Sequence, residues 1–372
     1  MKRIRVLETI RQGKIGGGES HVLDLVASLD KQLFELVVLS FTDGPMITAL
    51  EEMGIPAHVI HTEKAFDLRV WKKVKQFIRN QQIDIVHVHG TRANTNVLWA
   101  ARTLGLPVVY TIHGWSFHEG LPPITRRLRI AVEKFITRQT QVNICVSESN
   151  RQTGIKAFHT FNSIVVRNGI NLDKFNAAAI YPDLRAAYGI PADKVLICFI
   201  ARMTLQKDPV TMIKAFAAAW QQAPKLQLLM IGDGELKTAA MSAAATLGVE
   251  EQVIFGGFRQ DIPAILQAAD IYCLPSLWEG FPIGVLEAMA MGKAIIATDV
   301  DGTKEAVTDG VNGCLVPMGC PEKLAAAMVK LATDPALRKQ LQGNAQAAVK
   351  EHFHVADMTA RIAEVYQQLC KP

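Results

Sequence analysis

The stretch VLICFIARMTLQKDPVTMIKAFAAAWQ, residues 195–221, contains a complete strand–loop–helix unit. Its first six residues, Val195–Ile200, are a near-continuous apolar run, which is typical of a strand buried in a parallel sheet. Asp208 is a helix-capping residue and Pro209 suits the first helical position, so this spacing predicts a helix from Asp208 to Gln221. A buried strand that leads into a helix favours an α/β fold with a parallel sheet.

The same alternation occurs along the rest of the chain in two series. The strands expected before this stretch are Ile4–Thr9, Leu36–Ser40, Ala57–Ile60, Ile85–His89, Val108–Ile112, Asn143–Val146 and Ser163–Arg167. Those expected after it are Gln227–Ile231, Val253–Phe255, Ile271–Leu274, Ala294–Thr298 and Gly313–Val316. The weakly periodic stretch Asn171–Pro191 is interpreted as a linker. The pattern predicts two doubly wound, Rossmann-like domains that face each other across a deep cleft, with ligands beyond the carboxyl ends of the strands.

Composition and charge agree with a two-domain globular protein. The 372 residues are 49% apolar and 20% charged, which excludes a disordered chain or a small disulfide scaffold. The net charge of +5 is unevenly distributed. Residues 1–175 carry 23 Lys and Arg against 15 Asp and Glu, whereas the remaining residues carry 17 against 20. This asymmetry suggests that the two domains meet different partners, although ordinary variation in surface charge explains it equally well.

The cysteines and the hydropathy pattern predict where the protein acts. The six cysteines are scattered and form no metal-type CxxC pair, which indicates a reduced, cytoplasmic protein. No run reaches the roughly 18 apolar residues that are needed to span a bilayer. Any membrane contact is therefore expected to be peripheral, on the inner face of the cell membrane.

A glycine-rich loop, Gly16-Gly17-Gly18-Glu19-Ser20, lies between the first expected strand and a helix expected from Ser20. Glycines let a ligand approach the backbone, and a helix N-terminus offers unpaired N–H groups to an anion or a sugar hydroxyl. The loop lacks the GxGxxG spacing of dinucleotide sites, and the chain has no GxxxxGK[ST] phosphate loop. A plain glycine-rich turn remains the alternative.

Two cations follow the strand Val195–Ile200. Arg202 and Lys207 lie at its expected carboxyl end, before the helix that Asp208 caps. This is the position in which a doubly wound sheet binds a diphosphate. A solvated charged loop has the same appearance in a sequence.

The stretch PSLWEGFPIGVLEAMAMG, residues 275–292, carries two carboxylates eight residues apart. Pro282 favours a helix that begins nearby, which places Glu279 in the preceding loop and Glu287 on the second turn. The two carboxylates can then contact different parts of one elongated ligand, with the helix N-terminus between them holding a phosphate. Glu287 lies among apolar residues, where a carboxylate needs a partner.

This stretch resembles the E-x7-E motif of family 4 retaining glycosyltransferases, which have the two-domain GT-B fold. The resemblance covers nearly the whole chain, with further motifs in the family's order. They are Gly16-Gly17-x-Glu19 within one residue of register, Asp84–His89, Thr111–Gly114, Arg167–Ile170, the Arg202 and Lys207 pair, Phe255–Phe258 and Ala306–Gly313. The resemblance implies an acceptor-binding domain at 1–172, with a C-terminal helix at about 356–372, and a donor-binding domain at 173–355.

The resemblance also implies roles for single residues. Arg202 and Lys207 would hold the nucleotide diphosphate, Glu279 the donor sugar and Glu287 the ribose. His113 would hydrogen-bond the donor sugar near the reacting carbon. A neutral hydrogen-bonding role is preferred for it, a general base is the alternative, and no nucleophile is assigned. Many members have Gly where this chain has Pro282, so the amides facing the phosphate are expected from its neighbours. The further expected donor contacts are Gly17, Phe258, Ile283 and Gly284.

The acceptor is expected on the first domain. Gly16, Gly17 and Glu19 would approach it, and Trp115 and Phe117 would stack on a sugar ring. The run around these aromatic residues is similar to that of bacterial transferases acting on polyprenyl-diphosphate-linked sugars. The following segment is basic and amphipathic, which favours an anionic membrane surface, although an ordinary charged helix is the alternative. The basic residues expected to face that membrane are Arg126, Arg127 and Arg129.

The function expected from these features is the retaining transfer of a hexose or N-acetylhexosamine. The donor would be a nucleotide-diphosphate sugar, expected to be UDP-linked, and the acceptor a glycan, expected to be polyprenyl-diphosphate-linked, in surface polysaccharide or lipopolysaccharide synthesis. Neither a metal nor a cofactor is expected, and nucleic acid is not an expected partner. Two alternatives are a nucleotide-sugar epimerase with the GT-B fold and a non-catalytic glycan-binding relative. The missing dinucleotide fingerprint disfavours a dehydrogenase.

Overall fold

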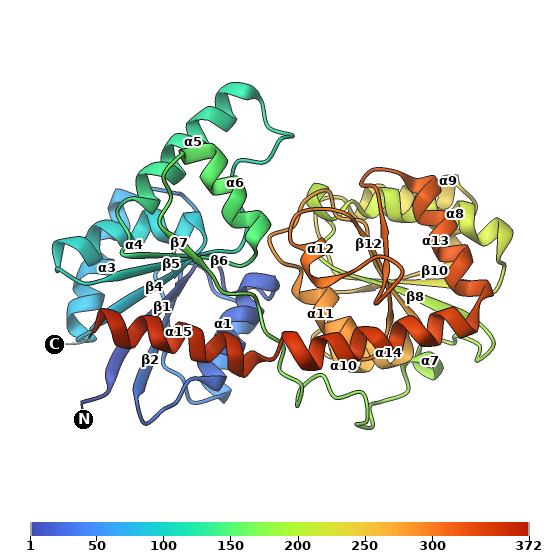
Figure 1. Cartoon of the computed structure of the whole chain (residues 1–372), viewed down its shortest axis with the longest axis horizontal. Coiled ribbons are helices and arrows are strands. Elements are labelled where there is room, and N and C mark those ends of the chain that lie inside the picture. Colours follow the sequence, from blue (N-terminus) through green and yellow to red (C-terminus); the bar gives the residue numbers. More distant parts are fainter. Residues whose placement is uncertain (1, 371–372) are drawn as a thin grey trace. The chain divides into compact units, whose positions relative to one another are not determined.

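The computed structural model describes residues 2–370, so the first and the last two residues of the expected first domain lie outside it. The chain divides into two compact units. Unit 1 is Met1–Gly169 together with Val355–Pro372, and unit 2 is Ile170–His354. Each unit contains one parallel sheet with helices on both faces, as the alternating pattern predicts (Figure 1).

Unit 1 contains a seven-stranded sheet of order β3-β2-β1-β4-β5-β6-β7. The strands are β1 (Ile4–Ile10), β2 (Phe34–Ser40), β3 (Ala57–Val59), β4 (Ile85–His89), β5 (Val108–Ile112), β6 (Val142–Cys145) and β7 (Ser163–Val165). The helices are α1 (Gly17–Ser28), α2 (Pro45–Glu52), α3 (Leu68–Asn80), α4 (Thr91–Thr103), α5 (Pro123–Thr137), α6 (Glu148–Phe158) and α15 (Val355–Leu369).

The two faces of the unit 1 sheet have separate cores because successive strand residues point to opposite sides. On β1, Val6 packs with α1 and α15, whereas Leu7 packs with α3 and α4. Figure 1 shows α1 and α15 on one side of this sheet and α3 and α4 on the other. Both cores consist largely of buried Val, Leu and Ile, as a sheet covered on both faces requires.

The C-terminal helix α15 completes unit 1 although the chain reaches it only after passing through unit 2. Ile362 and Tyr366 are fully buried against the sheet, and α15 packs beside α1. The Tyr366 hydroxyl donates a hydrogen bond to Glu8 Oε1 of β1 over 2.7 Å. The last helix is thus held by both apolar packing and a buried polar contact.

Unit 2 contains a six-stranded sheet of order β10-β9-β8-β11-β12-β13. The strands are β8 (Val195–Ile200), β9 (Leu226–Ile231), β10 (Val253–Gly257), β11 (Ile271–Leu274), β12 (Ala294–Thr298) and β13 (Cys314–Val316). The helices are α7 (Leu184–Ala187), α8 (Pro209–Gln222), α9 (Lys237–Thr246), α10 (Ile262–Ala268), α11 (Ile283–Ala290), α12 (Thr303–Ala306), α13 (Pro321–Thr333) and α14 (Pro335–His352), with 3-10 turns at Leu205–Lys207 and Glu250–Gln252.

Two local features differ from the sequence-based expectations. Helix α1 begins at Gly17, three residues before Ser20, because Gly16 is extended and the glycines after it adopt helical geometry. The stretch 171–191, expected to be a linker, belongs to unit 2. Its residues Leu184 and Ile190 are buried in a core with strands β8 and β9 and helix α10. This segment therefore packs as part of the domain instead of joining two domains loosely.

The strand order defines one switch point in each unit, where the connections leave in opposite directions. In unit 1 it lies between β1 and β4, and in unit 2 between β8 and β11. Ligands of doubly wound sheets bind at the carboxyl ends of such strand pairs. Within residues 2–370, no helix is both long enough and apolar enough to cross a bilayer.

Candidate active site

The unit 2 switch point brings together residues that the sequence predicts separately. Lys207 follows β8 and Glu279 follows β11, and the Lys207 ammonium contacts Glu279 Oε1. Ser276 Oγ donates a hydrogen bond to the same carboxylate oxygen over 2.6 Å. The Glu279 side chain is only 7% exposed, so its charge needs these partners. The predicted cation and the predicted sugar-binding carboxylate thus form one ion pair, in which Lys207 is half-buried and Glu279 is buried.

Hydrogen bonds from both backbone and side-chain groups join the loop after β8 to the loop after β11. The Gln206 side-chain amide donates to the Trp278 carbonyl over 2.8 Å, and the Leu277 N–H donates to the Gln206 carbonyl over 2.8 Å. The Glu279 N–H donates to Asp301 Oδ2 over 3.2 Å. Sequence reasoning missed Ser276, Gln206 and Asp301. Two of them adjoin or lie inside the motifs already singled out, whereas nothing in the sequence signals the contact of Asp301.

Helix α11 begins directly after this loop. Pro282 is its N-cap and provides no side-chain cap, and Glu287 lies on the second turn, as predicted. Gly284 leaves no room for a side chain, because a Cβ there would lie 2.6 Å from the Tyr272 hydroxyl oxygen. The first-turn amides of Ile283 and Gly284 are therefore positioned closely against the sheet, where a helix N-terminus favours an anion.

The other predicted donor contacts of unit 2 are accessible. Arg202 is exposed, and its guanidinium forms no hydrogen bond or ion pair with any residue that the structure describes. Phe258 is 49% exposed, just beyond β10. Both side chains are available to a ligand. Together with Lys207, they give this end of the sheet a cationic and an aromatic contact.

Unit 1 places its predicted residues at its own switch point. Gly16 is the N-cap of α1, and Glu19 lies in the first turn and is buried. A Cβ on Gly18 would lie 3.5 Å from Cδ2 of the His113 ring, so the glycine loop runs beside this histidine. His113 follows β5, next to the end of β4. The glycine loop and His113 therefore occupy one site.

A buried polar network lies behind His113. His113 Nε2 lies 3.1 Å from His89 Nδ1, and His89 Nε2 lies 2.8 Å from Glu8 Oε2. His87 contacts the same carboxylate oxygen, with Nδ1 3.1 Å from Glu8 Oε2. Sequence reasoning missed Glu8 and included His87 and His89 only as part of the Asp84–His89 motif, with no role assigned to either. Glu8 carried no signal, because a lone carboxylate in a strand does not reveal its partners.

Burial and mutual charge control protonation in this network. Burial lowers the pKa of His21 to about 3 and that of His89 to about 4, and it lowers the pKa of His113 well below its usual range. Burial alone would raise the pKa of Glu8, but the charge and hydrogen bonds of His87 and the hydrogen bond from His89 hold it well below the usual value. At neutral pH, His21, His89 and His113 are therefore uncharged beside an ionised Glu8.

These pKa values predict that the protein loses stability in mild acid. The unfolded chain returns each histidine to a pKa near 6.5, so it binds more protons than the folded chain below that pH. The free energy of unfolding should fall as the pH drops from about 6.5 to about 4, by up to ~1.4 kcal/mol per pH unit for each buried histidine. Urea unfolding curves between pH 4.5 and 7.5 measure this slope. A flat profile would contradict the neutral assignment.

The aromatic residues after His113 form a cluster instead of an open platform. Phe117 is 3% exposed and packs against Trp115 and Phe158, so its ring is a core residue and not the sugar-stacking surface predicted from the sequence. Trp115 is half-buried, and its indole N–H donates to the Asn150 carbonyl over 2.7 Å. Of this predicted pair in the described chain, only Trp115 therefore keeps partial exposure for contact with an acceptor.

The Glu133 carboxyl group of α5 accepts hydrogen bonds from the loop after His113 and from two neighbouring elements. Thr91 and Ser116 each donate a hydroxyl hydrogen bond to Glu133 Oε1 over 2.6 Å, and Tyr110 donates to Oε2 over 3.2 Å. Burial raises the pKa of Glu133, and these hydrogen bonds partly offset the increase. This carboxyl group joins α4, β5, α5 and the loop after His113, and no pattern in the sequence singles it out.

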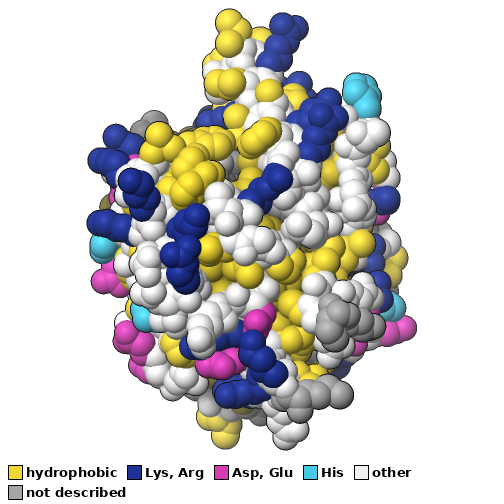
Figure 2. Space-filling model, turned by 90° about the vertical axis from the view of Figure 1, so that its left-hand side faces the viewer, with side chains coloured by type: hydrophobic (Ala, Val, Ile, Leu, Met, Phe, Trp, Pro, Cys, Tyr) yellow, Lys and Arg dark blue, Asp and Glu magenta, His cyan; other side chains and the backbone are white. Residues whose placement is uncertain are grey.

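The outer face of α5 is both basic and apolar. Ile124 is 82% exposed and Leu128 65% exposed, at a helical spacing that places them on one side. Arg127 and Arg129 are exposed beside them, although Arg129 also donates to the Ser116 carbonyl over 2.7 Å. Arg126 is half-buried. Figure 2 shows basic and hydrophobic side chains gathered together at the end of unit 1 that carries α5.

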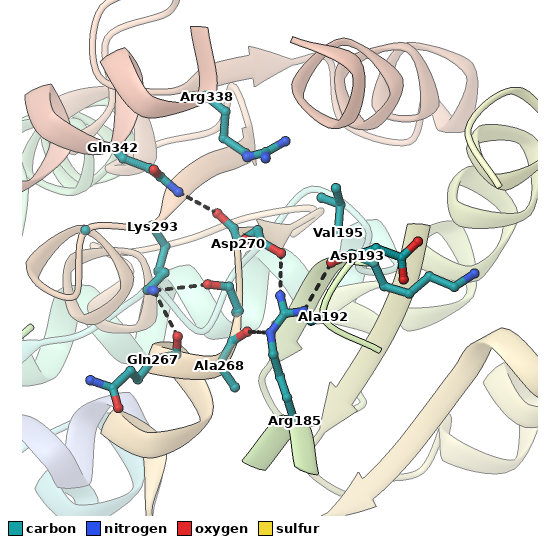
Figure 3. Close-up of a pocket in the computed structure, with 13 residues that line it drawn as sticks. Arg185, Ala192, Asp193, Val195, Gln267, Ala268, Asp270, Lys293, Arg338 and Gln342 are labelled. Atoms are coloured by element: carbon teal, nitrogen blue, oxygen red, sulfur yellow. Dashed lines mark hydrogen bonds and ion pairs between the residues drawn. The ribbon is translucent and has the colours of Figure 1, made fainter. Parts of the chain in front are cut away.

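A separate surface cavity of about 460 Å³ lies in unit 2 (Figure 3). It borders the amino ends of β8 and β11, away from Arg202 and Glu279 along the strands. Arg185 pairs with Asp270 over 2.6 Å, and the Lys293 ammonium donates to the Ala269 carbonyl over 3.0 Å. Because its charges are already satisfied by the chain, this cavity does not compete with the switch point as a candidate active site.

Comparisons with known proteins match both units. Residues 15–174 match the model described as Glycosyltransferase Family 4, and residues 181–348 match that of Glycosyl transferases group 1. EpsD of Bacillus subtilis (strain 168), which is designated a glycosyltransferase, is 30% identical over 81% of this chain and 80% of its own. The UDP-Gal:alpha-D-GlcNAc-diphosphoundecaprenol alpha-1,3-galactosyltransferase of Escherichia coli is 25% identical over 91% of this chain and 90% of its own.

Solved structures agree with the sequence relatives. The crystal structure of Anabaena Alr3699/HepE in complex with UDP-glucose is 26% identical to this chain, with a TM-score of 0.87. The match covers 98% of this chain and 100% of that one. Such a likeness extends over both units and both sheets.

Proposed function

The chain belongs to the family 4 glycosyltransferases and has their GT-B fold, and from this premise we propose that it transfers a hexose or N-acetylhexosamine from a UDP-sugar to a polyprenyl-diphosphate-linked glycan. The donor rests on the UDP-glucose held by the Anabaena structure and on the UDP-Gal named for the Escherichia coli relative. The acceptor rests on the diphosphoundecaprenol in that relative's name. We propose that this transfer is a step of surface polysaccharide or lipopolysaccharide assembly and takes place on the cytoplasmic side of the membrane.

The observation that carries the proposal is the grouping at the unit 2 switch point. Lys207 and Arg202 follow β8, and Glu279 and the N-terminus of α11 follow β11. Two cations and a helix N-terminus suit a diphosphate, and a carboxylate suits sugar hydroxyls. We assign the diphosphate to Arg202, Lys207 and the amides of Ile283 and Gly284, the ribose to Glu287, and the uracil side to Phe258.

The chemistry follows from where charge develops. The bond from the anomeric carbon to the β-phosphate oxygen breaks, and a bond to the acceptor oxygen forms on the same face, which retains the configuration. The acceptor proton passes to the departing diphosphate. Preorganised cations stabilise the negative charge that grows on this leaving group, so the step needs no metal ion. His113 is neutral and serves as a hydrogen-bonding group for the donor sugar.

Unit 1 is assigned to the acceptor, and unit 2 to the donor. The glycine loop of Gly16, Gly17 and Glu19 lies beside His113, and we assign the acceptor hydroxyl to this loop. Trp115 extends this site. The boundaries proposed for these roles, 1–172 with about 356–372 for the acceptor and 173–355 for the donor, lie within three residues of those of the compact units.

The test is a screen of nucleotide sugars read as released nucleotide, with and without lipid-linked acceptors. A transferase releases UDP only when an acceptor is present and forms a glycosylated lipid. An epimerase instead interconverts donor sugars without an acceptor, and a non-catalytic relative does neither. UDP at 100 times its dissociation constant should stabilise the fold by about 2.7 kcal/mol and raise Tm, whereas NAD should not. A fold that UDP leaves unaffected would count against the proposal.

We further propose that α5 binds an anionic membrane surface through Arg126, Arg127 and Arg129. Each basic residue near such a surface contributes about 1 kcal/mol, and exposed Ile124 and Leu128 can insert beside them. Reversing the three arginines to Glu should lower binding to phosphatidylglycerol vesicles by more than about 100-fold in a sedimentation assay.

The matched control carries the same net charge change on unit 2. Exposed Lys214, Lys323 and Lys339, all reversed to Glu, should leave vesicle binding nearly unchanged. If both triple variants weaken binding equally, net charge and not α5 governs the interaction. Because Arg129 also holds the Ser116 carbonyl, a second variant, Leu128→Ser, tests the apolar part without disturbing that hydrogen bond.

A further inference from the structure

Three histidines converge at the switch point of unit 1. His21 comes from α1, His89 ends β4, and His113 follows β5. One ring nitrogen from each lies within 4.8 Å of the other two. The ring of His21 lies 4.8 Å from that of His113 and 5.3 Å from that of His89, between centroids. Three histidines from different parts of unit 1 thus bring one ring nitrogen each into the same small region.

The outer nitrogens of two of these rings are held by oxygen acceptors. His21 Nδ1 lies 2.9 Å from Asn168 Oδ1, and His89 Nε2 lies 2.8 Å from Glu8 Oε2. Each ring therefore directs its other nitrogen away from that acceptor. Histidines that bind a metal have this arrangement, because an oxygen acceptor fixes the tautomer and raises the basicity of the ligand nitrogen.

The inner nitrogen of His21 has no hydrogen-bond partner among the described residues. His21 is 2% exposed, and its Nε2 is a buried atom without such a bond. An unsatisfied buried polar atom is costly and needs an explanation. His89 Nδ1 and His113 Nε2 lie only 3.1 Å apart, so one site can be shared by all three nitrogens.

We propose that His21, His89 and His113 form a binding site for a divalent transition-metal ion of the Zn²⁺ type. Imidazole nitrogens suit zinc, copper and nickel, and three histidines that leave a fourth position open are a common zinc arrangement. The ion replaces the hydrogen bond between His89 and His113, and the displaced proton moves to His113 Nδ1.

A second cluster nearby is the weaker candidate. Glu8, His87 and His89 also bring their ligand atoms within 4.8 Å of one another. In that cluster, however, the atoms already have partners, because Tyr366 donates to Glu8 and Thr111 lies 2.7 Å from His87 Nε2. Glu8 instead acts as the outer acceptor for His89, and its negative charge favours a cation at the three-histidine site.

The ion would act as an inhibitor, and this consequence rests on the proposed function. His113 is assigned there to hydrogen-bonding the donor sugar, and an ion on its ring withdraws it from that contact. The proposed ion is therefore an inhibitor of the transfer reaction and not a cofactor for it. Micromolar Zn²⁺ should lower the rate of UDP release, and a chelator should restore it.

The binding test uses Co²⁺ as the probe and does not depend on activity. Full-length, tag-free, metal-stripped protein is titrated with Co²⁺, and visible d–d absorption should show one ion per chain in a low-symmetry site. His21→Phe keeps the ring volume and removes the ligand, so the affinity should fall at least about 100-fold. His61→Phe, at an exposed histidine, is the matched control and should bind as the wild type does.

Further variants keep the proposal falsifiable. Glu8→Gln and Asn168→Ala each remove an outer acceptor and should weaken Co²⁺ binding about 10- to 100-fold, which tests the site if His21→Phe fails to fold. Cys320→Ser with Cys370→Ser excludes the two half-buried thiols as ligands. Absence of a 1:1 cobalt spectrum, or equal affinity in wild type and all site variants, overturns the proposal. If the protein releases no UDP, the proposed function fails, but the cobalt titration still tests the metal site because it measures binding alone.

Discussion

Replacing Lys207 by Ala should lower kcat/KM for sugar transfer about 100- to 1000-fold, the loss typical of removing one preorganised group that stabilises developing charge. The Lys207 ammonium is placed at the carboxyl end of β8, where the proposed diphosphate leaves. It is also the charged partner of buried Glu279. Removing Lys207 therefore takes away a cation that stabilises the charge developing on the leaving diphosphate. Among the described residues, it also leaves the Glu279 carboxylate with the hydrogen bond from Ser276.

Steady-state rates of UDP release and a separate UDP-binding titration distinguish these two effects. Lys207→Arg keeps the charge and should recover part of the activity, because the guanidinium still reaches an anion but fits Glu279 differently. Lys214→Ala removes an exposed lysine from the same region of sequence and should leave the rate unchanged. An unaltered kcat/KM in a folded Lys207→Ala protein would remove this residue from the proposed mechanism.

Replacing Gly302 by Ala should lower kcat/KM about 100-fold without touching any proposed ligand contact. A Cβ at this position would lie 2.0 Å from the Gly280 carbonyl oxygen, far inside normal contact distance. The backbone of the loop next to Glu279 must therefore shift by about 1 Å. A misplacement of that size in a group that positions the substrate lowers the rate roughly 100-fold. The backbone φ of Gly302 is −71°, so the expected effect is steric and not conformational.

The control for Gly302 is Gly343 in the exposed middle of α14. A Cβ on Gly343 meets nothing within 4 Å, so Gly343→Ala should stabilise the protein by about 0.5–1 kcal/mol and leave the rate unchanged. Initial rates and urea unfolding on the two variants separate a local shift of the loop from general destabilisation. Full activity of Gly302→Ala would show that the loop absorbs the added methyl group.

The sequence predicts the fold well because its strongest signals are local. Runs such as Val195–Ile200 are apolar over a strand's length, and Asp208 with Pro209 marks a helix start within one residue. The start of α1 was predicted three residues late, because glycines are poor helix formers in isolation. The packed segment around Leu184 looked like a linker, since its four-residue helix is too short to produce a periodic pattern.

The candidate site is predictable only where its residues belong to a recognisable motif. Glu279, Glu287 and Lys207 could be named, but their mutual contact could not, because 72 residues separate Lys207 from Glu279. Glu8 and Tyr366 meet across 358 residues of sequence. Burial is equally hidden: Phe117 looked like a sugar-stacking surface until the packing of Trp115 and Phe158 around it was visible.

The return of the chain to unit 1 in α15 also sets an order for folding during synthesis. Unit 2 is one continuous segment, Ile170–His354, and can form as soon as it leaves the ribosome. Unit 1 is translated first, yet its core face beside α1 stays uncovered, and Glu8 lacks its tyrosine, until the last helix emerges. The N-terminal sheet is therefore the last to be completed, and the apolar face that α15 covers stays exposed to solvent until then.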